Sequence, residues 1–247
     1  VAIRKNPKLA YRNMQMVYSL RRIDWMAKNG FNWVRYGNDK DLEWWDKKLA
    51  DIEPHLRKRG MRISFGHHSF HMILPRRLYE NDHPDYFVRN QTPAGYYDHA
   101  PPIGDPNAAR GQFPWDLTHA DVLDEVIWRL EGFLRRHPEV GQFDFWPSDG
   151  RCHIRPEEYK AMTGEEMPAE GRWTENAKFY SETGRLGDPR KTKVFHQMAK
   201  RIGEALQQKL PDVEFVISAY SDMPQPAPDV RLPENISATL AMYWRCY

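Results

Sequence analysis

The sequence lacks several features that would place it in a specialised class of proteins. Its 247 residues include two cysteines, Cys152 and Cys246, which form no spaced pair and predict neither a disulfide framework nor a zinc site. No apolar run is long enough to cross a bilayer, and no signal peptide is visible, although Val1 is not an initiator residue. The net charge of +2 gives no electrostatic reason to expect a nucleic-acid partner. What remains is a globular chain, long enough for one large α/β domain or two small ones.

Aromatic residues are what the sequence has in quantity. They make up 13% of the chain and include nine tryptophans, accompanied by 19 prolines. Two interpretations stay open. The rings pack a hydrophobic core, or several of them line a wet cleft, where flat aromatic faces suit the apolar faces of sugars.

Short β-like stretches alternate with amphipathic helical stretches along the chain. The strand candidates are residues 9–17, 31–37, 61–68, 141–149, 213–221 and 236–247. The helix candidates are residues 19–30, 39–60, 118–138 and 190–211. Pro54 predicts a kink or a break in the second helix, and Thr118 is the expected N-cap of the third.

This alternation predicts a parallel sheet, because helical crossovers connect parallel strands. Short turns precede the strands, whereas the two long connections, 69–117 and 150–188, follow strands. The asymmetry is typical of a (β/α)8 TIM-type barrel, whose functional loops lie at the carboxyl ends of the strands. A doubly wound sheet is disfavoured, since no GxGxxG turn is present. We therefore expect a single α/β domain over residues 1–247, a TIM-type barrel that is incomplete because six strands cannot close it.

In such a barrel, residues at the carboxyl strand ends are candidates for a site. They include donors for hydroxyl groups and rings for stacking, a combination that suits a carbohydrate. The candidate substrate-binding residues are Arg12, Arg35, Tyr36, His67, His68, His71, Tyr220, Trp244 and Arg245.

Two aspartates are the candidate catalytic residues. Asp149 ends the fourth strand within Pro-Ser-Asp-Gly, which is also ordinary turn chemistry. Paired carboxylates of glycosidases flank the scissile bond, and Asp222, at the end of the next strand, is the better second carboxylate. The base could equally lie on strands that the chain lacks. Asp144 precedes Asp149 by five residues, so strand alternation directs it to the opposite face, and we expect it outward between the helices as a structural partner.

The segment GHHSFH, residues 66–71, resembles a cluster of metal ligands. His67 and His71 have the spacing that suits zinc on a helix, but they follow a strand, and neighbouring strand residues point to opposite faces. No HExxH motif supports a metal. We predict no metal and no cofactor, with a metal-dependent hydrolase using His67 and His71 as one alternative.

Several segments, taken in order, resemble one protein family. They are FNWVRYG (31–37), GHHSFHMILP (66–75), HPDYFVRN (83–90), LTHADVLDEVIWRLEGFLRRHPEVGQFDFWPSDG (117–150) and ALQQKLPDVEFVISAY (205–220). Over most of residues 8–247 the chain is similar to domain-of-unknown-function 4838 proteins, glycoside-hydrolase-like barrels related to α-glucuronidases and, more distantly, to β-hexosaminidases. The resemblance implies a (β/α)8 catalytic domain and secreted or periplasmic handling of polysaccharides in bacteria. It also implies that Asp149 takes the place of the fourth-strand acid and His71 lies in the sugar-contacting loop.

This sequence departs from the family pattern in two ways. Many relatives carry a cysteine cluster after the Asp-Gly pair, where only Cys152 and His153 stand here. The corresponding acid of α-glucuronidases is a glutamate, one methylene longer than Asp149. The sequence therefore predicts a glycoside hydrolase with a carbohydrate partner, uronic-acid-containing chains among the candidates. A non-catalytic carbohydrate-binding barrel is the alternative.

Overall fold

Six parallel strands form one sheet in which the spatial order equals the chain order. The computed structural model describes residues 9–15, 19–37, 40–87, 115–146, 154–169, 189–219, 223 and 226–240. The strands are β1 (Asn13–Gln15), β2 (Trp33–Tyr36), β3 (Arg62–His68), β4 (Val140–Trp146), β5 (Glu214–Ala219) and β6 (Ile236–Leu240). Each pairs in parallel with its neighbour in sequence. A doubly wound sheet would reverse its strand order, so this single winding confirms the predicted TIM-type α/β architecture with six strands.

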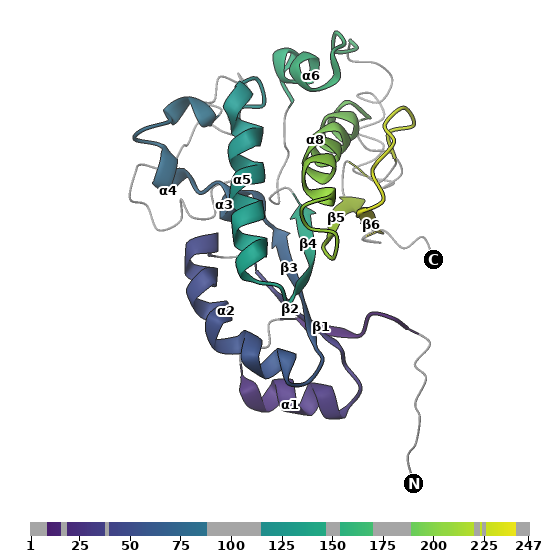
Figure 1. The fold of residues 1–247 in the computed structure, drawn as a ribbon. Helices are drawn as coiled ribbons and strands as arrows, with labels where there is room; N and C mark the ends of the chain where they lie inside the picture. Colours follow the sequence, from purple (N-terminus) through teal and green to yellow (C-terminus); the bar gives the residue numbers. More distant parts are fainter. Residues whose placement is uncertain are drawn as a thin grey trace, which may run out of the picture.

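The crossover helices lie along one face of the sheet. They are α1 (Leu20–Lys28), α2 (Leu42–Arg57), α5 (Ala120–Arg136) and α8 (Pro189–Gln207). In Figure 1, α5 lies between α2 and α8 beside the strands, and α6 (Pro156–Thr163) packs against α8. Among the described residues, no helix is both long and apolar enough to span a membrane.

The connection from β3 to α5 is not irregular throughout, although the sequence predicts a loop over 69–117. Its described part contains α3 (Phe70–Ile73), α4 (Arg76–Tyr79) and the 3-10 turn η1 (Pro84–Tyr86). The bend into α4 begins at Pro75, which cannot continue a helix from α3. The chain therefore leaves β3 as a series of short turns above the sheet edge.

Helix boundaries follow local capping chemistry, with two departures from the prediction. Asp41 caps α2 by accepting a hydrogen bond from the Trp44 N–H at 2.9 Å. His119, not Thr118, caps α5, because the Thr118 hydroxyl is engaged with Asp116 instead. Helix α2 runs unbroken through Pro54, so of the predicted kink or break, the break is wrong. Pro54 lies on the exposed face in the last turns, where the carbonyl that loses its partner is accessible to water.

Aromatic rings fill the space between the sheet and its helices. The Phe65 ring of β3 lies 5.2 Å from Trp45 of α2 and 5.1 Å from Phe133 of α5, measured between centroids. Phe143 of β4 lies 5.7 Å from Phe65, and all four side chains are buried. These contacts identify the face of each strand that is turned toward the helices.

A buried histidine joins α2 to the end of α5 at the amino end of β4. The His137 Nδ1 lies 2.9 Å from Glu53 and its Nε2 lies 2.7 Å from Asp46. Burial by itself would lower the pKa of His137, but the hydrogen bonds with the two carboxylates raise the pKa above its ordinary value. This end of the molecule is thus held by charged groups that serve packing.

Candidate functional site

The face of the sheet turned away from the helices, here called the inner face, carries polar side chains. Because strand residues alternate, and Phe143 points to the helices, Gln142, Asp144 and Trp146 lie on the inner face. Arg35 lies on the same face of β2, since its neighbour Tyr36 packs against Trp45 of α2. Polar and aromatic groups from β2 and β4 therefore converge toward the carboxyl half of the sheet.

An ion pair between Arg35 and Asp144 spans the strand that separates β2 from β4. The Arg35 Nη2 contacts Asp144 Oδ2, and the guanidinium carbon lies 5.5 Å from the centre of the Trp146 ring. Gly66 of β3 pairs in register with Asp144. Because Gly66 has no side chain, none stands between Arg35 and Asp144 at this position. A Cβ on Gly66 would lie 2.6 Å from the Asp144 carbonyl oxygen, and its φ of +114° also favours glycine. The missing side chain is what lets Arg35 reach across β3.

Asp144 is the most buried charged group of this cluster, with 3% of its surface exposed. Burial raises the pKa of Asp144 to about 6, the attraction of Arg35 opposes the rise, and Glu214 adds to it. The prediction that Asp144 points outward between the helices is wrong. Alternation relates Asp144 to its neighbours, but only the contacts of Phe143 show which face belongs to the helices.

A second polar layer lies below this cluster, toward the amino end of the strands. Gln142 donates from Nε2 to Glu214 Oε2 at 2.6 Å, and the Tyr11 hydroxyl donates to the same oxygen at 3.3 Å. The Tyr11 ring also lies 5.2 Å from Trp33, which is in turn 5.5 Å from the Arg62 guanidinium. The donors of Gln142 and Tyr11 are both paired with Glu214, and the contacts connect the segment before β1 to β5. We therefore interpret this layer as structural.

Two residues predicted to bind substrate lie elsewhere. Arg12 precedes β1 and is therefore at the amino end of the sheet, where its Nε donates to the Gly30 carbonyl at 2.6 Å. The first strand begins four residues later than predicted, which moves Arg12 to the wrong end for a site. Tyr36 is buried on the helix-facing side, 5.7 Å from Trp45 between ring centroids. Arg12 thus lies at the opposite end of the sheet from the one predicted, whereas Tyr36 ends β2 as predicted but faces the helices.

The other predicted residues divide into those the structure places and those outside it. Arg35 is on the inner face, and His71 lies in α3, partly exposed. The backbones of His67 and His68 belong to β3 and pair with Phe145 and Trp146. The remaining predicted site residues lie outside the described residues, and they are Asp149, Asp222, Tyr220, Trp244 and Arg245.

Helix α3 is fixed directly above the end of β4. The Ser69 N–H donates to the Trp146 carbonyl at 3.0 Å. The Phe70 ring stacks on Trp115 at 4.6 Å and lies 4.8 Å from Phe145. His71 is thus carried to the carboxyl edge of the sheet by a short helix with a packed underside.

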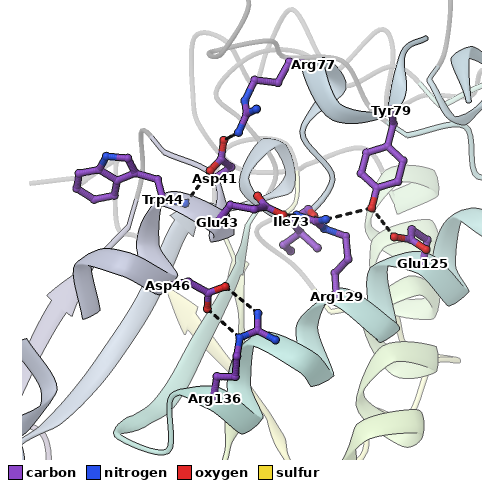
Figure 2. A network of polar contacts seen from close by, with 10 residues as sticks. All are labelled: Asp41, Glu43, Trp44, Asp46, Ile73, Arg77, Tyr79, Glu125, Arg129 and Arg136. Carbon is purple, nitrogen blue, oxygen red and sulfur yellow. Dashed lines mark hydrogen bonds and ion pairs between the residues drawn. The ribbon is translucent and has the colours of Figure 1, made fainter. Parts of the chain in front are cut away.

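A polar network holds the same connection against α2 and α5 (Figure 2). Arg129 of α5 donates to the Ile73 carbonyl and pairs with Glu43 of α2. Its Nη1 also donates to the Tyr79 hydroxyl at 3.1 Å, and that hydroxyl donates to Glu125. Burial raises the pKa of Tyr79 to about 12, and the hydrogen bond to Glu125 adds to the rise, so the phenol stays protonated as a donor. Arg129 therefore links three segments that are distant in sequence.

Sequence reasoning missed Asp144 and Trp146 as members of the cluster. The signal was present in QFDFW, residues 142–146, where polar side chains alternate with Phe143 and Phe145. The described tryptophans are either buried or exposed on helices α1, α2 and α5, and the buried ones agree with the interpretation as core. Trp33, Trp45, Trp115 and Trp146 are buried, whereas Trp25, Trp44 and Trp128 are exposed. Within the described ranges, no group of three or more histidine, cysteine, aspartate or glutamate side chains is arranged to hold a metal ion.

Comparisons with known proteins place the chain in a family without assigning an activity. No curated protein matches the sequence at a significant level. One solved structure, described as a family GH13_31 enzyme, is 11% identical with a TM-score of 0.43, over 81% of this chain and 42% of that one. This chain thus spans less than half the length of that structure, and a similarity at this level carries no information on function. The family model described as "Domain of unknown function (DUF4838)" matches residues 1–243, and the chain belongs to that family.

Proposed function

We propose that the protein is a glycoside hydrolase that acts on an oligosaccharide or polysaccharide. The observation that supports the proposal is the convergence of Arg35, Asp144 and Trp146 on the inner face of a singly wound parallel sheet. Barrels of this winding carry their active sites at the carboxyl ends of the strands. The guanidinium supplies a hydrogen-bond donor for a sugar hydroxyl, and the buried indole of Trp146 packs against it.

The sequence offsets of the two candidate catalytic aspartates from the ends of their strands support the proposal. Strands β4 and β5 are neighbours and end at Trp146 and Ala219. Asp149 and Asp222 are each the third residue after the end of their strand. Two carboxylates that leave adjacent parallel strands at equal offsets are suited to act on one bond.

In the proposed reaction Asp149 is the general acid and Asp222 its partner. The protonated Asp149 donates to the glycosidic oxygen as the bond to the anomeric carbon breaks, and Asp222 acts as base toward water or as nucleophile. The separation of the two carboxyl groups decides between these routes, since about 5 Å gives retention and about 6.5–9.5 Å gives inversion. The partner is a carbohydrate, with uronic-acid-containing chains among the candidates, and a secreted or periplasmic location remains a prediction from the resemblance.

Hydrolysis of a panel of oligosaccharides by wild-type protein and an Asp149→Asn variant tests the proposal. We expect the variant to lose roughly 100-fold or more in kcat, the usual contribution of a general acid, with little change in KM. Asp212→Asn is the matched control, because Asp212 is exposed at the opposite, amino end of β5 and should leave kcat unchanged. Full activity of Asp149→Asn would overturn the mechanism. Binding without turnover that survives this substitution would instead support the non-catalytic carbohydrate-binding barrel.

A further inference from the structure

The Arg35 guanidinium is held on two sides and has a donor without an acceptor. Asp144 binds Nη2, and the Trp146 ring lies beneath the plane at 5.5 Å. Within the described part of the chain, the buried Nε of Arg35 makes no hydrogen bond. A buried N–H without an acceptor is unfavourable, so a group that supplies an oxygen there is stabilised.

The Arg35 side chain is partly accessible to solvent, although its Nε is buried. The Arg35 side chain is 21% exposed, whereas that of Asp144 is 4% exposed. Gly37 follows β2 and Gly66 lies on β3, and a Cβ on Gly37 would lie 2.5 Å from the Gly66 carbonyl oxygen. Both positions are therefore restricted to glycine, and it is the partial exposure of the Arg35 side chain that makes it accessible to a ligand.

We propose that Arg35 is a substrate-contacting residue that donates a hydrogen bond to a sugar hydroxyl, and that Asp144 is the residue that positions it. This inference rests on the proposed function and deepens it. The choice of a hydroxyl over a carboxylate follows from charge, because ionised Asp144 neutralises Arg35 and leaves no surplus positive charge to attract an anion. The buried Trp146 ring packs against the guanidinium and helps to fix its orientation.

The first test compares Arg35→Lys with wild-type protein on three neutral probes, cellotetraose, xylotetraose and chitotetraose, and one acidic probe, trigalacturonic acid. We expect KM for the cleaved neutral probe to rise roughly tenfold or more, with kcat changed far less, because lysine cannot keep the bond to Asp144 while donating from the Nε position. Arg57→Lys is the matched control. Arg57 also pairs with a buried carboxylate, Glu139, but at the amino end of the sheet, and its substitution should leave KM unchanged.

The second test uses pH to separate positioning from packing. Three residues face Asp144 from the neighbouring strands. They are Arg35 of β2, Gly66 of β3 and Glu214 of β5. Since the pKa of Asp144 is raised to about 6, wild-type binding should strengthen as the pH rises through 6 and the ion pair forms. Asp144→Asn should bind more weakly and lose this inflection. A purely structural role would lower the melting temperature of the variant without moving the pH profile.

A measurement on the wild-type protein keeps the inference testable if a variant fails to fold. The Arg35 Nε–H resonance should shift in a ¹⁵N-correlated spectrum when the cleaved neutral probe is added. Cleavage with no shift, or an unchanged KM for Arg35→Lys, would overturn the role of Arg35 and leave the proposed function standing. An effect confined to trigalacturonic acid would overturn the choice of a hydroxyl. Failure of the wild-type protein to bind or cleave any of the four probes would overturn both proposals.

Discussion

The two faces of strand β4 differ in polarity: the face toward the helices is apolar, and the inner face carries charge. Phe143 points to the helices and is surrounded by the rings of Phe65 and Phe215. Asp144, the next residue, points to the inner face and pairs with Arg35. The helix-facing side gains stability from burying apolar surface, which is non-directional. The inner face instead holds charged groups in a fixed geometry, which contributes little to net stability but suits recognition of a polar ligand.

The largest effect is expected on the helix-facing side, at Phe143. Replacing Phe143 by alanine removes a fully buried ring and leaves a cavity between β4 and its helices, so we expect a loss of about 3–5 kcal/mol of unfolding free energy. Denaturant unfolding monitored by tryptophan fluorescence measures it. A loss below about 1 kcal/mol would show that the aromatic layer does not carry the stability assigned to it here.

Asp144 should give a smaller and pH-dependent effect. Its folded-state pKa of about 6 lies above that of an unfolded aspartate, so between about pH 4 and 6 the folded state binds the additional proton. The contribution of Asp144 to unfolding free energy therefore falls as the pH rises through this window, by about 2 kcal/mol between roughly pH 4.5 and 7. Unfolding at both pH values should show that loss in wild-type protein relative to Asp144→Asn. Equal pH dependence of the two proteins would contradict the raised pKa.

Charges in the helical layer offer a third comparison, because there they serve structure. Arg129→Met removes the partners of the Ile73 carbonyl and of Glu43, and we expect it to cost about 1–2 kcal/mol. Arg136→Met is the control on the same helix (Figure 2). Arg136 is 57% exposed and pairs with Asp46 at 2.8 Å, so its removal should cost about 0.5 kcal/mol or less. Thermal unfolding of the two variants measures the difference, and a larger loss for Arg136→Met would reverse this assignment.

A smaller effect than at Phe143, Asp144 or Arg129 is expected at Gln142, on the inner face beside Phe143. Gln142→Ala removes one hydrogen bond to Glu214, which keeps its contact with Tyr11, so we expect a loss of about 0.5–1 kcal/mol. The same denaturant experiment applies. A loss comparable to that of Phe143→Ala would show that both faces of β4 contribute equally to stability.

Most of the architecture could be predicted because its signals are local. The apolar runs and caps that define α1, α2, α5 and α8 are read from a few consecutive residues, and the placement of short and long connections predicts single winding. Errors occurred where local signals compete. The weak first strand begins at Asn13, four residues later than its pattern predicts, so Arg12 lies at the amino end of the sheet. His119 takes the N-cap position of α5 in place of Thr118.

The sequence by itself determined the order of strands and helices and the parallel winding, because periodicity and connection length act along the chain. Only the tertiary structure decided which faces of β2 and β4 meet the helices, and with them the positions of Tyr36 and Asp144. The Arg35–Asp144 pair joins residues from two strands across a third, and it forms because Gly66 lies in register between them. Register and the absence of a side chain are relations between strands, which no local pattern in the sequence records.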